Sequence, residues 1–139
     1  MLVTTIPQYV QGLLNVKVDL TTTDKKTIYT APSNADFNAS VISSILAINK
    51  SSSASTLSFT ITGDGVDGGS GAVTSHEFLY TTNTTLSALS TVEFLPNTSR
   101  DLILNAGEVV KVQAGHADRV QIIMSIQEYA VVRTPQVDL

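Results

Sequence analysis

The 139-residue chain contains no cysteine and no tryptophan. The absence of cysteine excludes disulfides, thiolate metal ligands and thiol nucleophiles, so the fold must be stabilised by packing alone. Charged residues are also scarce, at 14% of the chain against roughly a quarter in ordinary globular domains. The formal net charge of -4 and the scattered Lys and Arg residues provide no basic surface for phosphates, so we expect no nucleic-acid partner.

Long apolar runs are missing as well. No run approaches the roughly 18 residues that cross a bilayer, so we expect no membrane partner. The first 18 residues, MLVTTIPQYVQGLLNVKV, lack the basic start and continuous apolar stretch of a signal peptide. We therefore expect the chain to be synthesised in a cytoplasm and kept there.

The strongest pattern in the chain is alternation of β-branched or aromatic residues with polar ones. In LNVKVDL every second residue is apolar, and TLSFTIT repeats the pattern, as expected for strands with one buried face. Nine segments are predicted as strands: 14–20, 27–30, 41–49, 56–62, 77–81, 91–95, 101–104, 109–114 and 119–129. Short turn-forming clusters separate them, and no segment has a sustained helical stripe. The chain is predicted to be all-β, an antiparallel β-sandwich of the jelly-roll or immunoglobulin-like type.

Two terminal segments do not follow this alternation. We predict an N-terminal arm at residues 1–12, a β-sandwich domain at 13–130 and a C-terminal arm at 131–139. Apolar arm residues suit binding to neighbouring subunits, because an arm can add a strand to another sheet or lie in its groove. The candidate interface residues are Leu2, Ile6, Tyr9, Val10, Val131, Val132, Pro135 and Val137.

The segment GDGVDGGSG, residues 63–71, contains a G-x-G-x-x-G pattern after a predicted strand. A dinucleotide site also needs a helix that starts at the last glycine, yet the next residues, AVTSHEFLYTT, are typical of a strand. We interpret the segment as a hairpin or inter-strand loop. A calcium site using Asp64 and Asp67 is an alternative, but it would need ligands from elsewhere in the chain.

No combination of residues predicts catalysis. His76 and His116 are each placed at a loop edge without a second ligand, and no G-x-S-x-G elbow occurs. The four glutamates stay unassigned, because strand folds bring distant acids together. The tyrosines suit a core or an interface better than a sugar platform. No catalytic residue, metal ligand or cofactor is therefore predicted.

Two long stretches carry a resemblance to a known group of proteins. They are KKTIYTAPSNADFNASVISSILAINKSSSASTLSFTITG and TVEFLPNTSRDLILNAGEVVKVQAGHADRVQIIMSIQEY, which together cover most of residues 25–129. Their order of strands and turns resembles that of small virion proteins of tailed bacteriophages. The resemblance implies a β-sandwich that serves as a structural part of a phage particle, with no functional residues to carry over.

The expected function is therefore that of a non-enzymatic virion structural protein, located in the virion. A capsid decoration, or cement, protein is the first expectation, and a neck, tail or baseplate component is the alternative. The expected partners are other virion proteins, either the major capsid protein or neck and tail proteins, together with further copies of the chain in a homo-oligomer. A carbohydrate-binding or adhesin module is a further alternative.

Overall fold

The computed structural model describes residues 8–69, 71–95 and 101–131. Nine strands and no helix occur within these ranges. The strands are β1 (Gln8–Leu20), β2 (Lys26–Thr30), β3 (Phe37–Asn49), β4 (Ser55–Val66), β5 (Ala72–Leu86), β6 (Thr91–Glu93), β7 (Leu102–Leu104), β8 (Val109–Ala114) and β9 (Val120–Val131). Each of the nine predicted strand segments corresponds to one of them.

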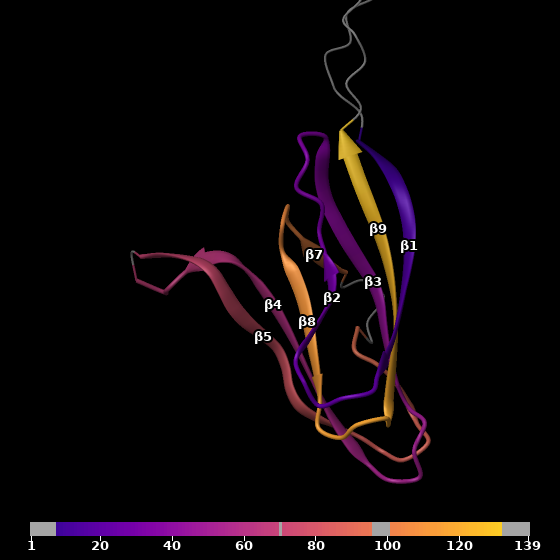
Figure 1. The fold of residues 1–139 in the computed structure, drawn as a ribbon. Helices are drawn as coiled ribbons and strands as arrows, with labels where there is room; N and C mark the ends of the chain where they lie inside the picture. The colour runs from indigo at the N-terminus through magenta and orange to yellow at the C-terminus, as the bar shows by residue number, and fades with distance from the viewer. Residues whose placement is uncertain (1–7, 70, 96–100, 132–139) are drawn as a thin grey trace, which may run out of the picture.

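The strands form two antiparallel sheets that face each other (Figure 1). The first sheet has the order β1-β9-β3-β6, and β7 also pairs with β3. The second sheet has the order β2-β8-β4-β5. This arrangement confirms the prediction of an all-β, antiparallel sandwich.

The core lies between the sheets and follows from the alternation in the sequence. In β9, Ile122, Met124 and Ile126 are almost completely buried, while the residues between them are half-buried on the outer face. The Phe59 ring from the second sheet meets the Phe94 ring edge to face, with centroids 5.1 Å apart. Since adjacent strand residues point to opposite faces, the period of two places one set of apolar side chains inside.

A buried polar cluster links the two sheets near the end of β9. The Tyr29 hydroxyl of β2 donates a hydrogen bond to Glu128 Oε2 at 2.5 Å and lies 2.6 Å from Ser40 Oγ of β3. A phenol has one proton, so the Ser40 hydroxyl donates to the phenol oxygen. Burial, followed by the bond to Glu128, raises the pKa of Tyr29 well above its ordinary value. The phenol therefore stays protonated and remains a donor.

Part of the predicted N-terminal arm lies in the first sheet. β1 begins at Gln8, so residues 8–12 are part of the first sheet, where Gln8 lies opposite Val131 of β9. The ladder extends this far because β9 runs on to Val131 and provides backbone partners beyond a bulge between Val10 and Gly12. Residues 1–7 and 132–139 lie outside the described part of the chain.

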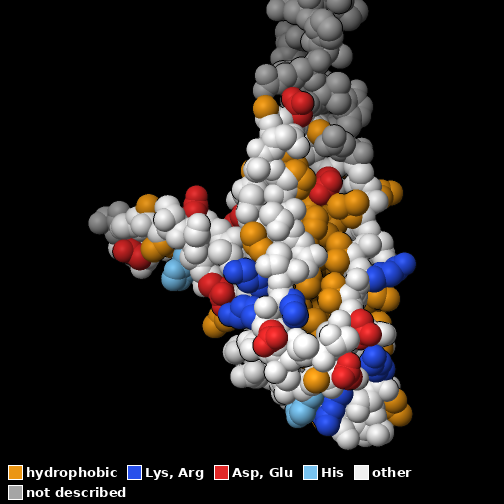
Figure 2. All heavy atoms as spheres, viewed as in Figure 1, with side chains coloured by type: hydrophobic (Ala, Val, Ile, Leu, Met, Phe, Trp, Pro, Cys, Tyr) orange, Lys and Arg blue, Asp and Glu red, His pale blue; other side chains and the backbone are white. Residues whose placement is uncertain are grey.

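One lateral side of the sandwich is incompletely covered. The edge strands β1 and β2 lie along this side, and their half-buried Val16, Val18 and Ile28 pack against the core. Figure 2 shows a band of hydrophobic side chains along the same side. We call this band, defined by Val16, Val18 and Ile28, the apolar seam.

The Tyr29 cluster generates a stability prediction. Tyr29→Phe removes the donor to Glu128 and leaves the fully buried Ser40 without its partner, so the free energy of unfolding should fall by about 1–3 kcal/mol. Urea denaturation followed by circular dichroism measures the change.

Tyr129→Phe is the matched control, because the Tyr129 hydroxyl bonds Gln127, two residues away in the same strand. Its effect should be clearly smaller. Equal stability of the Tyr29→Phe variant and the unchanged protein would contradict the assigned role of this cluster.

Candidate interaction surfaces

The β4–β5 hairpin extends past the rest of its sheet. Strand β8 pairs with β4 only as far as Thr62, opposite Val109, whereas β4 and β5 continue to pair up to Val66 and Ala72. Residues 63–69 and 71–76 thus form a two-stranded ribbon, with its turn, that bends away from the sandwich (Figure 1). A two-stranded ribbon is only marginally stable alone, so its conformation must depend on specific local contacts.

The hairpin turn is held by one carboxylate. Asp67 Oδ1 accepts hydrogen bonds from the backbone N–H groups of Gly69, at 2.9 Å, and Gly71, at 3.1 Å. The first of these bonds and then the second lower the pKa of the Asp67 carboxyl. Gly68 has a φ of 87°, which glycine adopts without steric cost. The glycine-rich segment therefore closes a hairpin, as interpreted from the sequence, and the strand β5 follows where a nucleotide site would need a helix.

Contacts at the base of the ribbon set its bend. Asp64 Oδ1 accepts a hydrogen bond from Ser75 N at 3.0 Å, where Ser75 has a φ of 50° and the ladder is irregular. The Phe78 ring covers Gly65 so closely that a Cβ there would lie 2.5 Å from Phe78 Cζ. His76 meets the same ring edge to face, with centroids 5.0 Å apart. His76 lies within β5, so the prediction that it stands at a loop edge is wrong.

β5 also exposes apolar side chains. Among the described residues it pairs with β4 alone, so its other edge is uncovered. Leu79 is 66% exposed and Phe78 40%, and Val66 at the end of β4 is 72% exposed. Glu77 is the sole charged residue of the strand. Natural edge strands usually carry lysine, proline or other features that prevent pairing with other chains, so an edge strand with one charged residue and exposed apolar side chains indicates an interaction surface.

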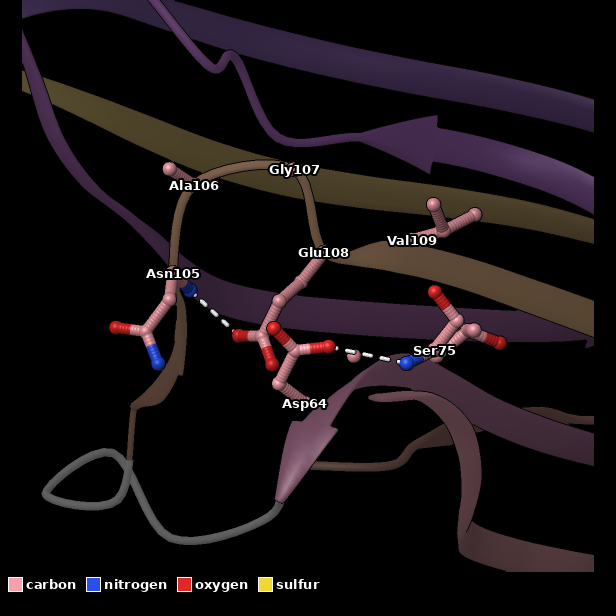
Figure 3. Close-up of a pocket in the computed structure, with 9 residues that line it drawn as sticks. Asp64, Ser75, Asn105, Ala106, Gly107, Glu108 and Val109 are labelled. Carbon is pink, nitrogen blue, oxygen red and sulfur yellow. Dashed lines mark hydrogen bonds between the residues drawn. The ribbon is translucent and has the colours of Figure 1, made fainter. Parts of the chain in front are cut away.

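A cavity of about 270 Å³ lies beside the base of the ribbon. Figure 3 shows the Asp64 and Glu108 carboxyl groups pointing toward the same space. Asp64 accepts a bond from Ser75, and Glu108 Oε1 accepts one from Asn105 N at 2.6 Å. Asp67 is engaged in its own turn, and no group of three His, Asp or Glu side chains suited to a metal occurs in the described part of the chain. The structure thus brings one further carboxylate, Glu108, beside Asp64, but in the described residues no third carboxylate or imidazole joins the two.

A second cavity, of about 160 Å³, lies on the outer face of the second sheet. Lys25, Lys111, Glu77, Thr60 and Leu79 are among its lining residues, and we call this site the lysine pocket. Lys25 Nζ lies 2.5 Å from Glu77 Oε1, and this hydrogen bond lowers the pKa of Glu77. Two ammonium groups face one carboxylate, so the pocket keeps a net positive charge. Figure 2 shows basic side chains gathered where the ribbon leaves the sandwich.

The four glutamates, which the sequence left unassigned, each have a structural partner. Glu77 pairs with Lys25, Glu108 accepts from Asn105, and Glu128 accepts from Tyr29. Glu93 Oε2 accepts from the backbone N–H groups of Ile45, at 2.7 Å, and Leu95, at 3.1 Å. Their partners lie in different parts of the sandwich, so the glutamates serve local structure at separate places.

The remaining histidine and tyrosines are also engaged in structure. His116, between β8 and β9, has Nδ1 3.3 Å from Ser55 Oγ. The Tyr80 hydroxyl donates to the Phe94 carbonyl oxygen at 2.7 Å, and burial raises its pKa. Tyr29 is a core residue. The prediction for the tyrosines was a core or an interface, and of these two Tyr29 is in the core whereas Tyr80 is 37% exposed.

The predicted arm residues fall into two groups. Tyr9 and Val10 lie in β1 opposite Ala130 and Tyr129, and Val131 is the last residue of β9. Leu2, Ile6, Val132, Pro135 and Val137 lie outside the described residues. Because Gln8 and Val131 are opposite each other, the two strands that lead into the arms end side by side at one end of the sandwich (Figure 1).

No protein-family model matches the chain, and no curated protein sequence is significantly similar to it. Among solved structures, the chain is similar to a chain from the infectious bursal disease virus Gt strain, with 11% identity and a TM-score of 0.46 over 92% of this chain and 33% of that one. A second is a chain of the T13 particle of the same virus, with 10% identity and a TM-score of 0.44 over 89% of this chain and 40% of that one.

The chain thus spans between a third and two fifths of the length of those viral chains. At such identities and TM-scores the likeness does not bear on what this chain does. Among the described residues, no helix has the length and apolar character needed to cross a membrane.

The Asp67 turn generates a prediction about pH. The folded pKa lies below the unfolded value of about 3.9, so the carboxylate's contribution to turn stability is complete above that value and is lost as the pH falls through the folded pKa. NMR titration of the Asp67 carboxyl carbon should give a lower midpoint in the folded protein than in urea. Identical midpoints in the two states would show that the backbone bonds to Gly69 and Gly71 are not maintained in solution.

Proposed function

We propose that this chain is a non-enzymatic structural protein of a virion, and that it binds neighbouring subunits through its arms and sheet edges. The observation that carries the proposal is the position of the two strand ends that lead into the arms. The strands β1 and β9 end side by side at Gln8 and Val131, so both arms start from one end of the sandwich. Two linked arms that bind the same neighbour reinforce each other, because the second contact forms at a high effective concentration.

The apolar seam provides a complementary surface for such an arm. Val16, Val18 and Ile28 are half-buried along edge strands whose outer backbone groups have no strand partner among the described residues. An extended apolar segment of a neighbouring subunit would hydrogen-bond to one edge and cover these side chains, which is how strand addition combines affinity with register. The apolar arm residues Leu2 and Ile6 are an even number of positions apart, so in an extended segment they would point to the same face.

The resemblance at residues 25–129 supports a tailed bacteriophage particle as the setting, and within it we propose a capsid decoration protein. A decoration protein is repeated across a symmetric shell, so small contacts of roughly 1,000 Å² or less can hold it through their number. A neck, tail or baseplate component would use the same surfaces in a single ring. The proposal of a non-enzymatic role is supported by the glutamates, each of which has a separate structural partner.

Electron microscopy of particles that contain the protein tests its location. We expect density for the sandwich over the whole capsid surface, in hundreds of copies per particle. A few tens of copies or fewer in one ring would instead identify a neck or tail component. Purified particles without the protein would contradict a virion role altogether.

Deletion of the arms tests how the protein attaches. Removal of residues 1–7 leaves every described strand intact, so we expect an unchanged β-sheet circular dichroism signal and at least a tenfold loss of incorporation into particles. Removal of residues 1–12 is the structural comparison, because it also deletes five residues of β1 and should lower the unfolding midpoint. Normal incorporation of the shorter deletion would refute the role of the N-terminal arm.

A further inference from the structure

The ribbon, residues 63–69 and 71–76, and the lysine pocket have opposite charge. The ribbon carries Asp64 and Asp67, both exposed, and no Lys or Arg occurs anywhere between residues 51 and 99. The lysine pocket holds Lys25 and Lys111 against the single carboxylate of Glu77. In a chain with so few charges, this separation creates one acidic projection and one basic cavity.

Among the described residues, no other strand pairs with the ribbon beyond Thr62. It leaves the sheet where β8 ends, and Figure 2 shows acidic side chains on the part that projects. Val66, 72% exposed, lies one residue from Asp67. An extended two-stranded ribbon with an exposed apolar side chain beside its carboxylates is suited to insertion against another surface.

The lysine pocket has unsatisfied groups of the matching kind. Lys111 has no ion pair among the described residues, and Lys25 pairs with Glu77 alone. Thr60 is 3% exposed, yet its Oγ1 has no hydrogen-bond partner within the described part of the protein. Leu79, 66% exposed, supplies an apolar rim. A carboxylate that entered here would meet two ammonium groups and give the Thr60 hydroxyl an acceptor.

We propose that the acidic end of the ribbon, at Asp64 and Asp67, binds the lysine pocket of a second copy of this chain, with Val66 packed against Leu79 at the rim. This inference deepens the proposed structural function and rests on it, by naming one subunit contact. The two surfaces are different parts of one chain, so the contact is heterologous, and repeated head-to-tail contacts close into a ring or extend as a filament. The opposite charges fix the register and speed association.

Sedimentation velocity of the full chain tests the contact. The unchanged protein should self-associate at low ionic strength and dissociate in 0.5 M salt, because exposed charge pairs are screened over roughly 4 Å at that concentration. Lys111→Glu should weaken association at least about tenfold, since it places a carboxylate against the incoming ribbon. Lys17→Glu is the matched control, because it makes the same charge change at an exposed position of β1 and should leave association intact.

A mixing experiment distinguishes this contact from a twofold-symmetric one. The Asp64→Asn/Asp67→Asn variant keeps the oxygen acceptors for Ser75, Gly69 and Gly71 but loses both charges, so it should fold and fail to associate. Mixed with Lys111→Glu, it should form a one-to-one dimer, since the acidic ribbon of one variant meets the intact pocket of the other. Circular dichroism and urea denaturation of each variant verify folding, and Lys111→Gln replaces Lys111→Glu if the latter unfolds.

Three results would overturn the inference: a monomeric unchanged protein at low salt, undiminished association of Lys111→Glu, or no complex in the mixture. The same variants should be assayed for incorporation into particles. If the variants lose self-association as expected but the protein is absent from particles, the virion function is refuted and the contact stands. If the unchanged protein is incorporated into particles but never self-associates, the contact is refuted and the virion function stands.

Discussion

The burial of two apolar sheet faces against each other is the constraint on which the rest of this structure depends. Apolar burial is worth roughly 25 cal/mol per Å², and neither sheet could cover its own inner face. Phe59, Ile122 and Met124 are at most 1% exposed, so the interior is filled by side chains. The surfaces left for binding are therefore the margins: the edges of the sheets, the ribbon and the arms. Because the inner sheet faces are used up in the core, this sandwich is better suited to assembly through its margins than to binding a ligand in a central cleft.

Charge is scarce in this chain, and several of the ionised side chains have an identifiable structural effect. Tyr29 and Glu128 join the two sheets through a hydrogen bond, and Glu93 satisfies backbone N–H groups beside β6. Lys50 and Asp19 pair across the opposite end of the sandwich, at 3.2 Å. The exposed lysine pocket stands out because most other charges either serve the fold locally or lie singly on the surface. Electrostatic contrast between two parts of one chain is then enough to define an orientation for assembly.

The strands were largely predictable from the sequence, because alternation is a local property that each segment carries by itself. Their pairing was not. Lys25 and Glu77 are 52 residues apart, and only the order of the strands brings them together.

The ribbon was interpreted as a hairpin or loop, since Gly and Asp have low strand propensity, but cross-strand pairing and the contact of Phe78 with Gly65 extend β4 and β5 through it. Residues 8–12 were assigned to the arm because a bulge near Gly12 interrupts the alternation, while β9 supplies their partners.

The pairing of Gln8 with Val131 also gives the sandwich two unlike ends. The connections at 50–54 and 115–119 meet at the other end, where Lys50 N donates to the Arg119 carbonyl oxygen. A foreign peptide inserted into the serine-rich connection after β3 would therefore emerge at the end of the sandwich opposite Gln8 and Val131. If the arms hold the protein to a surface, that connection faces away from the surface. The sandwich then separates an inserted sequence from the surface and exposes it to the surroundings.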